Sequence, residues 1–168
     1  MEKNKSLPQY LRDFLDYLEI EKGLSNKTQE NYSRFLNKFF TWLHDNNLNH
    51  LSPAQLTSDH IWKYRLFLSR HTDPKTKKTL KKSTQNYYLI ALRAFLDFLV
   101  EKDIPTLSPS KIKLAKDKSD KEVNFLKLEQ IEKLLTAPDS SGFRGALCKD
   151  TMETLASTGL RVAELIGL

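Results

Sequence analysis

The sequence predicts an all-α protein made of a four-helix bundle, a linker and the first helices of a second domain. In four segments of the first hundred residues, apolar residues recur every three or four positions, which is the period of an amphipathic helix. No segment there alternates apolar and polar residues as a half-buried strand does. Five Gly and six Pro in 168 residues, with 39% apolar and 29% charged residues, favour a folded helical chain over a disordered one.

Each of the four segments has a recognisable helix start. Ser, Thr and Asn accept hydrogen bonds from the free N–H groups of a first turn, and Pro fits there because it has no N–H. Asn26 and Gln29 also have the spacing of a capping box, and Gly23 is expected to end the first helix. The starts are expected at Ser6 with Pro8, at Ser25 or Asn26, at Thr57 or Ser58, and at Ser83.

The apolar stripes of these helices are expected to bury one another in a small bundle. Tyr32 and Tyr88 fall on the stripes, where core packing is the expected role of an aromatic ring. The stripes run from Leu7 to Leu18, from Tyr32 to Leu43, from Ile61 to Leu68 and from Leu89 to Leu99.

The chain carries an excess of positive charge. Twenty-seven Lys and Arg against twenty-one Asp and Glu give +6, which favours a polyanionic partner such as nucleic acid without proving one. Residues 71–82 hold five lysines and one aspartate, a net charge of +4. Because like charges at this density do not pack, this segment is interpreted as a mobile basic loop.

Cysteine usage and hydropathy bear on the compartment. Cys148 is the only cysteine, so no disulfide can form within the chain, and it is expected to be a small buried residue. No apolar run reaches the roughly 18–20 residues that span a bilayer, and no signal peptide is evident at the N-terminus. We therefore expect a soluble, cytoplasmic protein with no membrane partner.

Residues 104–124 have the composition of an extended linker, with two prolines and five lysines and no aromatic residue. Helical spacing resumes after it, over Phe125 to Leu135, Ala146 to Ser157 and Val162 to Leu168. Three short helices with unpaired apolar faces are not expected to form a complete domain.

The segment Thr158 to Leu165 reads TGLRVAEL and combines a turn, a helix start and an arginine. Gly159 allows a tight turn, Thr158 can cap the helix that follows, and Arg161 would fall in its first turn. A guanidinium beside free helix N–H groups suits a phosphate. The alternative from the residues alone is a solvated arginine paired with Glu164.

The same octet resembles the motif of the first catalytic arginine in tyrosine recombinases, the phage integrase and Xer-type family. Further similarity to the family lies at Leu11 to Ser25, Thr28 to Tyr32, Ser83 to Leu99 and Phe125 to Leu135. The resemblance implies a SAM-like core-binding bundle over residues 1–103, a linker over 104–124, and the start of the catalytic domain over 125–168. Two departures are Lys127, where the family has a Ser or Thr cap, and Leu147-Cys148, where an Arg-Asp pair is common.

The resemblance also implies a mechanism, in which a tyrosine hydroxyl attacks a DNA phosphate and forms a 3′-phosphotyrosyl bond without metal or cofactor. Arg161 would be catalytic, stabilising charge on the phosphoryl oxygens. All four histidines precede residue 72, the last tyrosine is Tyr88, and Arg144 and Arg161 are the only arginines after the linker. The second arginine, a lysine, the histidines and the nucleophilic tyrosine are thus expected beyond Leu168, and these residues alone are expected to be inactive.

Double-stranded DNA is the partner that the resemblance implies, bound by the second and fourth helices, with tetramers forming on DNA and a weakly associating monomer off it. Polar and basic groups near helix starts suit phosphate contact, although each could equally be solvated surface or a cap. The candidate DNA contacts are Lys27, Thr28, Asn31, Arg34, Lys38, Lys82, Ser83, Thr84, Asn86, Tyr87 and Arg93.

Three functions remain open at this point. The chain can be part of a strand-exchanging recombinase, a DNA-binding module that occupies a recombination site without cutting, or a helical adaptor with no nucleic-acid role. The basic charge and the specific motif favour the first two. Affinity for DNA at low salt separates them from the third.

Overall fold

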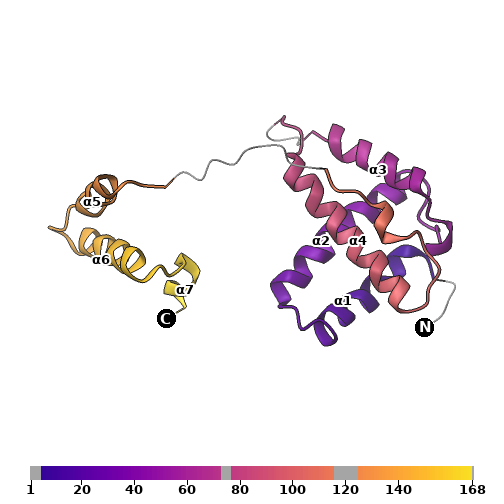
Figure 1. The fold of residues 1–168 in the computed structure, drawn as a ribbon, viewed down its shortest axis with the longest axis horizontal. Helices are drawn as coiled ribbons and strands as arrows, with labels where there is room; N and C mark the ends of the chain where they lie inside the picture. The colour runs from indigo at the N-terminus through magenta and orange to yellow at the C-terminus, as the bar shows by residue number, and fades with distance from the viewer. Residues whose placement is uncertain (1–4, 73–76, 116–124, 168) are drawn as a thin grey trace. The chain divides into compact units, whose positions relative to one another are not determined.

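The chain forms two compact helical units, Met1–Lys118 and Ser119–Leu168 (Figure 1). The computed structural model describes residues 5–72, 77–115 and 125–167. Those residues contain no strand, and only an isolated antiparallel bridge joins Thr72 to Thr79. The prediction of an all-α fold is confirmed. The centre of the predicted basic loop, 73–76, and the second part of the predicted linker, 116–124, lie outside the described residues.

The described residues of the first unit form four α-helices, as the four apolar stripes predict. A 3₁₀ turn precedes α1, a second precedes α3, and a third follows α4. Gly23 has a φ of 60°, the left-handed conformation that ends the helical path after α1. The elements are η1 Leu7–Tyr10, α1 Leu11–Ile20, α2 Asn26–Asp45, η2 Pro53–Gln55, α3 Ser58–Arg70, α4 Lys82–Glu101 and η3 Pro109–Lys111.

Three of the predicted helix starts, Ser6, Ser25 and Thr57, are confirmed as N-caps. The Thr57 hydroxyl accepts the backbone N–H of His60 at 3.4 Å. The prediction that Ser83 caps α4 is wrong, because Lys81 is the N-cap and its carbonyl accepts the N–H of Gln85. Ser83 therefore lies inside the first turn of α4 and is not its cap.

Helices α2 and α4 begin in the same way. Ser25 is the N-cap of α2, so the first of the two predicted starts is confirmed. The side-chain amide of Gln29 donates to the carbonyl of Leu24 at 2.9 Å. The amide of Gln85 donates to the carbonyl of Leu80 at 2.8 Å. In both helices a glutamine thus fixes the residue just ahead of the first turn.

The core of the first unit is rich in aromatic rings. Phe14 of α1, Phe39 of α2 and Phe95 of α4 are at most 1% exposed. The rings of Phe14 and Phe95 meet edge to face at 5.5 Å, a favourable arrangement for aromatic pairs. Each such buried side chain contributes about 1.5–3 kcal/mol, so the helices are stable only as a packed set.

The first part of the predicted linker differs from the expectation, because it packs on the bundle. Ile104 is 3% exposed and Ile112 is completely buried. Asn86 of α4 pairs with both backbone groups of Ala115, donating to its carbonyl at 2.9 Å and accepting its N–H at 3.0 Å. Arg93 donates to the carbonyl of Ile112. Residues 104–115 are therefore a strap that belongs to the first unit.

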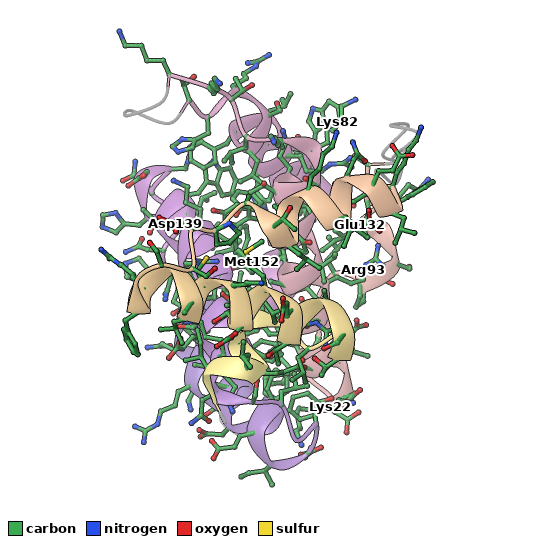
Figure 2. All side chains as sticks on the ribbon, turned by 90° about the vertical axis from the view of Figure 1, so that its left-hand side faces the viewer. Lys22, Lys82, Arg93, Glu132, Asp139 and Met152 are labelled. Atoms are coloured by element: carbon green, nitrogen blue, oxygen red, sulfur yellow. The ribbon has the colours of Figure 1, made fainter. Side chains whose placement is uncertain are left out.

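The second unit consists of α5 Leu128–Thr136, α6 Phe143–Thr158 and α7 Val162–Ile166. None of its described residues is buried, and Phe125, Leu128 and Phe143 are more than 70% exposed. The expectation that Cys148 is buried is wrong, since it lies exposed on α6. Met152 follows it by one turn of the same helix (Figure 2) and is partly buried. No helix in the part of the chain that the structure describes is long and apolar enough to cross a membrane.

Candidate nucleic-acid interface

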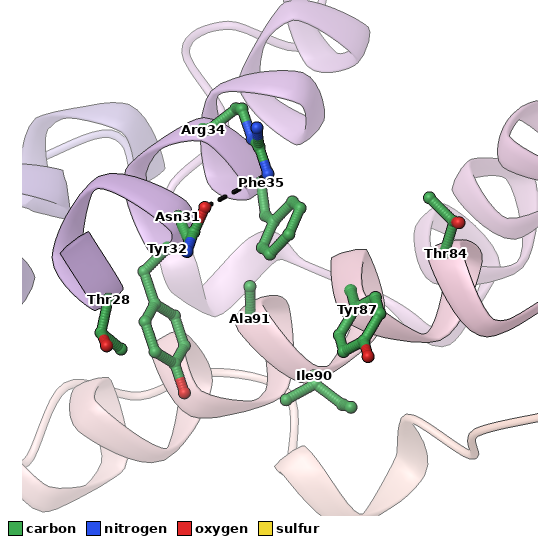
Figure 3. Close-up of a pocket in the computed structure, with 9 residues that line it drawn as sticks. All are labelled: Thr28, Asn31, Tyr32, Arg34, Phe35, Thr84, Tyr87, Ile90 and Ala91. Atoms are coloured by element: carbon green, nitrogen blue, oxygen red, sulfur yellow. Dashed lines mark hydrogen bonds between the residues drawn. The ribbon is translucent and has the colours of Figure 1, made fainter. Parts of the chain in front are cut away.

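A groove of about 430 Å³ runs between α2 and α4 on the first unit (Figure 3). Its α2 side follows the first three turns of that helix, and its α4 side follows residues 84–91. Five of the eleven predicted DNA contacts lie in it, from two helices that are not consecutive in the sequence. The groove is lined by Thr28, Asn31, Tyr32, Arg34 and Phe35 of α2 and by Thr84, Tyr87, Ile90 and Ala91 of α4.

The guanidinium of Arg34 is held by its own helix. Its Nη2 donates to Oδ1 of Asn31 at 3.2 Å, and its Cζ lies 5.1 Å from the ring centroid of Phe35. The Phe35 ring in turn lies nearly parallel to that of Tyr87, with centroids 6.2 Å apart. The guanidinium, the amide and the Phe35 ring of α2 and the Tyr87 ring of α4 are therefore ordered across the groove, before any partner binds.

Three other predicted contacts lie close to this groove in sequence. Lys27 is exposed and pairs with Glu30 at 2.8 Å, and this hydrogen bond holds the pKa of the Glu30 carboxyl below its usual range. Lys82 is exposed and Ser83 is partly buried in the first turn of α4. These three residues lie at the starts of the two helices that form the groove, but they do not line it.

The remaining three candidates are engaged within the protein. The Nζ atom of Lys38 lies 3.3 Å from Nε2 of His71 and over the ring of Phe67, so this side chain contacts α3 and the residue that follows it. Asn86 and Arg93 hold the strap on α4, as described above. None of these three side chains lines the groove.

Arg161 differs in position from the expectation. Gly159 makes the predicted turn, with a φ of 70° at the end of α6, but Arg161 is the N-cap of α7 rather than a residue of its first turn. Thr158 is the last residue of α6 and its hydroxyl donates to the Thr154 carbonyl, so it does not cap α7. The pairing with Glu164 is present, at 3.2 Å between Nη1 and Oε1, and the Arg161 side chain is 85% exposed.

Among the described residues, no three His, Cys, Asp or Glu side chains lie together in a way that could hold a metal ion. The residues that line the groove offer hydroxyl and amide groups, one guanidinium and apolar side chains.

The bundle and its groove correspond to a known domain. Residues 11–103, more than half of the chain, match the family described as "Phage integrase, N-terminal SAM-like domain". The chain belongs to this family. The match covers all of α1–α4, so both walls of the groove are part of the integrase SAM-like domain.

The similarity of this integrase-family chain to curated relatives extends past the matched domain. It is 31% identical over 158 residues to "Tyrosine recombinase XerC" of Natranaerobius thermophilus, covering 94% of this chain and 50% of the relative. It is 30% identical over 157 residues to "Tyrosine recombinase XerD" of Listeria innocua, covering 93% and 50%. The chain thus spans about half the length of the curated relatives it matches.

One solved structure is also similar to the integrase-family chain, the "Crystal structure of XerA recombinase". The identity is 24% and the TM-score 0.47, covering 95% of this chain and 49% of the other.

Sequence reasoning missed the apolar half of the integrase-domain groove. Tyr32 and Phe35 were predicted only as members of a buried apolar stripe. Ile90 and Ala91 were given no role of their own. Ile90 is nevertheless 39% exposed. The available signal was its place one position past Leu89 and two before Leu92, off the centre of the buried stripe.

Proposed function

We propose that this chain binds double-stranded DNA through the groove between α2 and α4, as part of a tyrosine recombinase that cuts and rejoins DNA. The observation that carries the proposal is the gathering of Thr28, Asn31 and Arg34 with Thr84 and Tyr87 along one groove. Hydroxyl, amide and guanidinium groups are the usual partners of phosphate oxygens and base edges. The net charge of +6 favours the same partner.

The recombinase part of the proposal rests on the second unit and on the relatives' names. Arg161 is the candidate for the first catalytic arginine, where it would stabilise charge on a phosphoryl oxygen. Its exposed side chain and its place at the start of α7 suit contact with an anion. We further propose that the complete protein assembles as a tetramer on DNA and acts in the cytoplasm.

A salt titration with a pair of matched variants tests the DNA-binding part. The 168-residue chain is titrated with a fluorescent 30-base-pair duplex at 50–300 mM KCl, as wild type, Arg34→Ala and Arg12→Ala. Arg12 is an exposed arginine on α1 that does not line the groove, so it controls for the loss of one positive charge.

The expected result is that Arg34→Ala weakens binding roughly tenfold and lowers the salt slope by about one unit, because one phosphate contact is lost. Arg12→Ala is expected to change affinity less than twofold. Absence of binding at 50 mM KCl contradicts DNA binding, and equal losses in the two variants contradict the assignment of the groove.

A further inference from the structure

The groove has an apolar floor inside its polar border. Ile90 is 39% exposed and Tyr87 is 57% exposed, and both lie on the α4 side facing the groove (Figure 3). Phe35 of α2 packs against Tyr87 from the opposite wall. Thr28, Arg34 and Thr84 supply the polar groups of the same groove.

Phosphate contact does not account for this floor. A phosphate oxygen placed against Ile90 would lose water and gain no hydrogen bond, which is unfavourable. The polar border can bind phosphates, but the floor requires an apolar group on the partner. In the major groove of DNA, the apolar group on the base edges is the C5-methyl of thymine.

We propose that the floor formed by Ile90, Tyr87 and Phe35 recognises the C5-methyl group of thymine in the major groove. This inference rests on the proposed DNA binding and names what the groove selects. Arg34 and the two threonines would anchor the neighbouring phosphates and so orient the base edge toward the floor. Ile90 is then the residue that determines specificity, because it is the exposed aliphatic side chain of the groove.

The cationic border argues for DNA rather than for an apolar segment of another protein. Arg34 lines the groove, and Lys27 and Lys82 are exposed at the starts of its two helices. An apolar peptide would offer no anion to Arg34 or Lys82, whereas a duplex carries phosphates on both sides of its base edges.

The experiment compares DNA duplexes that differ only in this methyl group. Duplexes that bind the 168-residue chain are first selected from a random library, and each thymine of the selected site is then replaced by uracil. A second series replaces cytosine by 5-methylcytosine at the neighbouring positions. Burying one methyl group is worth about fourfold in affinity, so the expected loss at the contacted thymine is about fourfold.

Ile90→Ala and Val100→Ala provide the matched variants. Val100 is a half-exposed aliphatic residue of the same helix that does not line the groove. In Ile90→Ala the thymine-over-uracil ratio is expected to fall from about four to below two, with affinity for the uracil duplex unchanged. In Val100→Ala the ratio is expected to stay at about four.

The outcomes separate this inference from the proposed function. If DNA binds but uracil and thymine duplexes bind equally at every position, thymine recognition is wrong and DNA binding stands. If the ratio persists in Ile90→Ala, the floor is not the sensor of the methyl group, and the inference is equally overturned. Absence of any DNA binding contradicts both.

Discussion

Replacing Ile112 by alanine tests whether the strap, residues 104–115, is part of the core of the first unit. The Ile112 side chain is completely buried, and its carbonyl accepts a hydrogen bond from Arg93. Truncating a buried isoleucine to alanine costs about 2–5 kcal/mol, because contacts are lost and a cavity is left. For a unit of this size the corresponding fall in Tm is about 8–20 °C.

Tryptophan fluorescence during urea unfolding reports on this unit alone, since both tryptophans, Trp42 and Trp62, lie in α2 and α3. Thermal melting followed by circular dichroism gives the Tm. Ile20→Ala is the matched control, because Ile20 is 80% exposed, and its effect is expected to stay within about 0.5 kcal/mol. If Ile112→Ala unfolds at the same urea concentration as Ile20→Ala, the strap does not contribute to the core.

Three further predictions concern other contacts. The Tyr64 hydroxyl is buried and has no hydrogen-bond partner among the described residues, so Tyr64→Phe is expected to leave Tm unchanged or raise it by up to about 5 °C; a clear fall would show that the hydroxyl is bonded. The hydrogen bond from Tyr17, with the nearby Lys22 charge, lowers the pKa of Glu101. A lowered pKa stabilises the fold above about pH 4 and the benefit is lost as pH falls through the folded-state pKa, so the Tm deficit of Glu101→Gln at pH 7 should shrink as the pH falls below about 4; a deficit that is constant with pH would refute the charge effect. Arg161→Ala is expected to change Tm by less than about 2 °C and DNA affinity by less than twofold, measured by melting and by the same salt titration; a large loss of stability would make Arg161 structural.

The sequence predicted the features that depend on neighbouring residues. Ser6 and Thr57 were identified as helix starts because a cap is formed within three residues of its partner. The apolar stripes of α1–α4 were identified because the helical period is local as well. The start of α4 was misplaced by two residues, since the Gln85 amide bond to Leu80 lies outside the usual capping pattern.

The strap could not be predicted from composition. The average composition of residues 104–115 is that of an exposed linker, because the segment contains two prolines and two lysines. This average hides the two isoleucines, Ile104 and Ile112, that are buried. Ile112 is held against Arg93 of α4, which lies 19 residues earlier in the sequence, and a short sequence window does not detect a contact over that separation. The same limit applies to Asn86 and Arg93, because a polar residue on a helix face can serve DNA or its own chain with the same sequence signal.

The groove depends both on residue spacing along each helix and on the packing of α2 against α4. Sequence spacing placed Thr28, Asn31 and Arg34 on one helix and Thr84 and Tyr87 on another, but only the crossing of α2 and α4 brings them together. Ile90 is also exposed at the groove, and its place off the centre of the buried stripe was the sequence signal for it. The polar contribution to the site is therefore visible in the sequence as residue types, whereas the apolar contribution is visible only as a position relative to the buried stripe.

The pairing of Arg161 with Glu164 does not conflict with a role in binding phosphate. The pair is exposed and its partners are three residues apart, so its contribution to stability is small and salt weakens it further. Glu164 also accepts the backbone N–H of Arg161 at 2.7 Å, a bond that fixes the start of α7 without using the guanidinium. A phosphate can therefore take over the side chain of Arg161 while the helix start stays in place. The carboxylate of Glu164 therefore holds the backbone at the start of α7, and the exposed guanidinium can exchange this carboxylate for a phosphate.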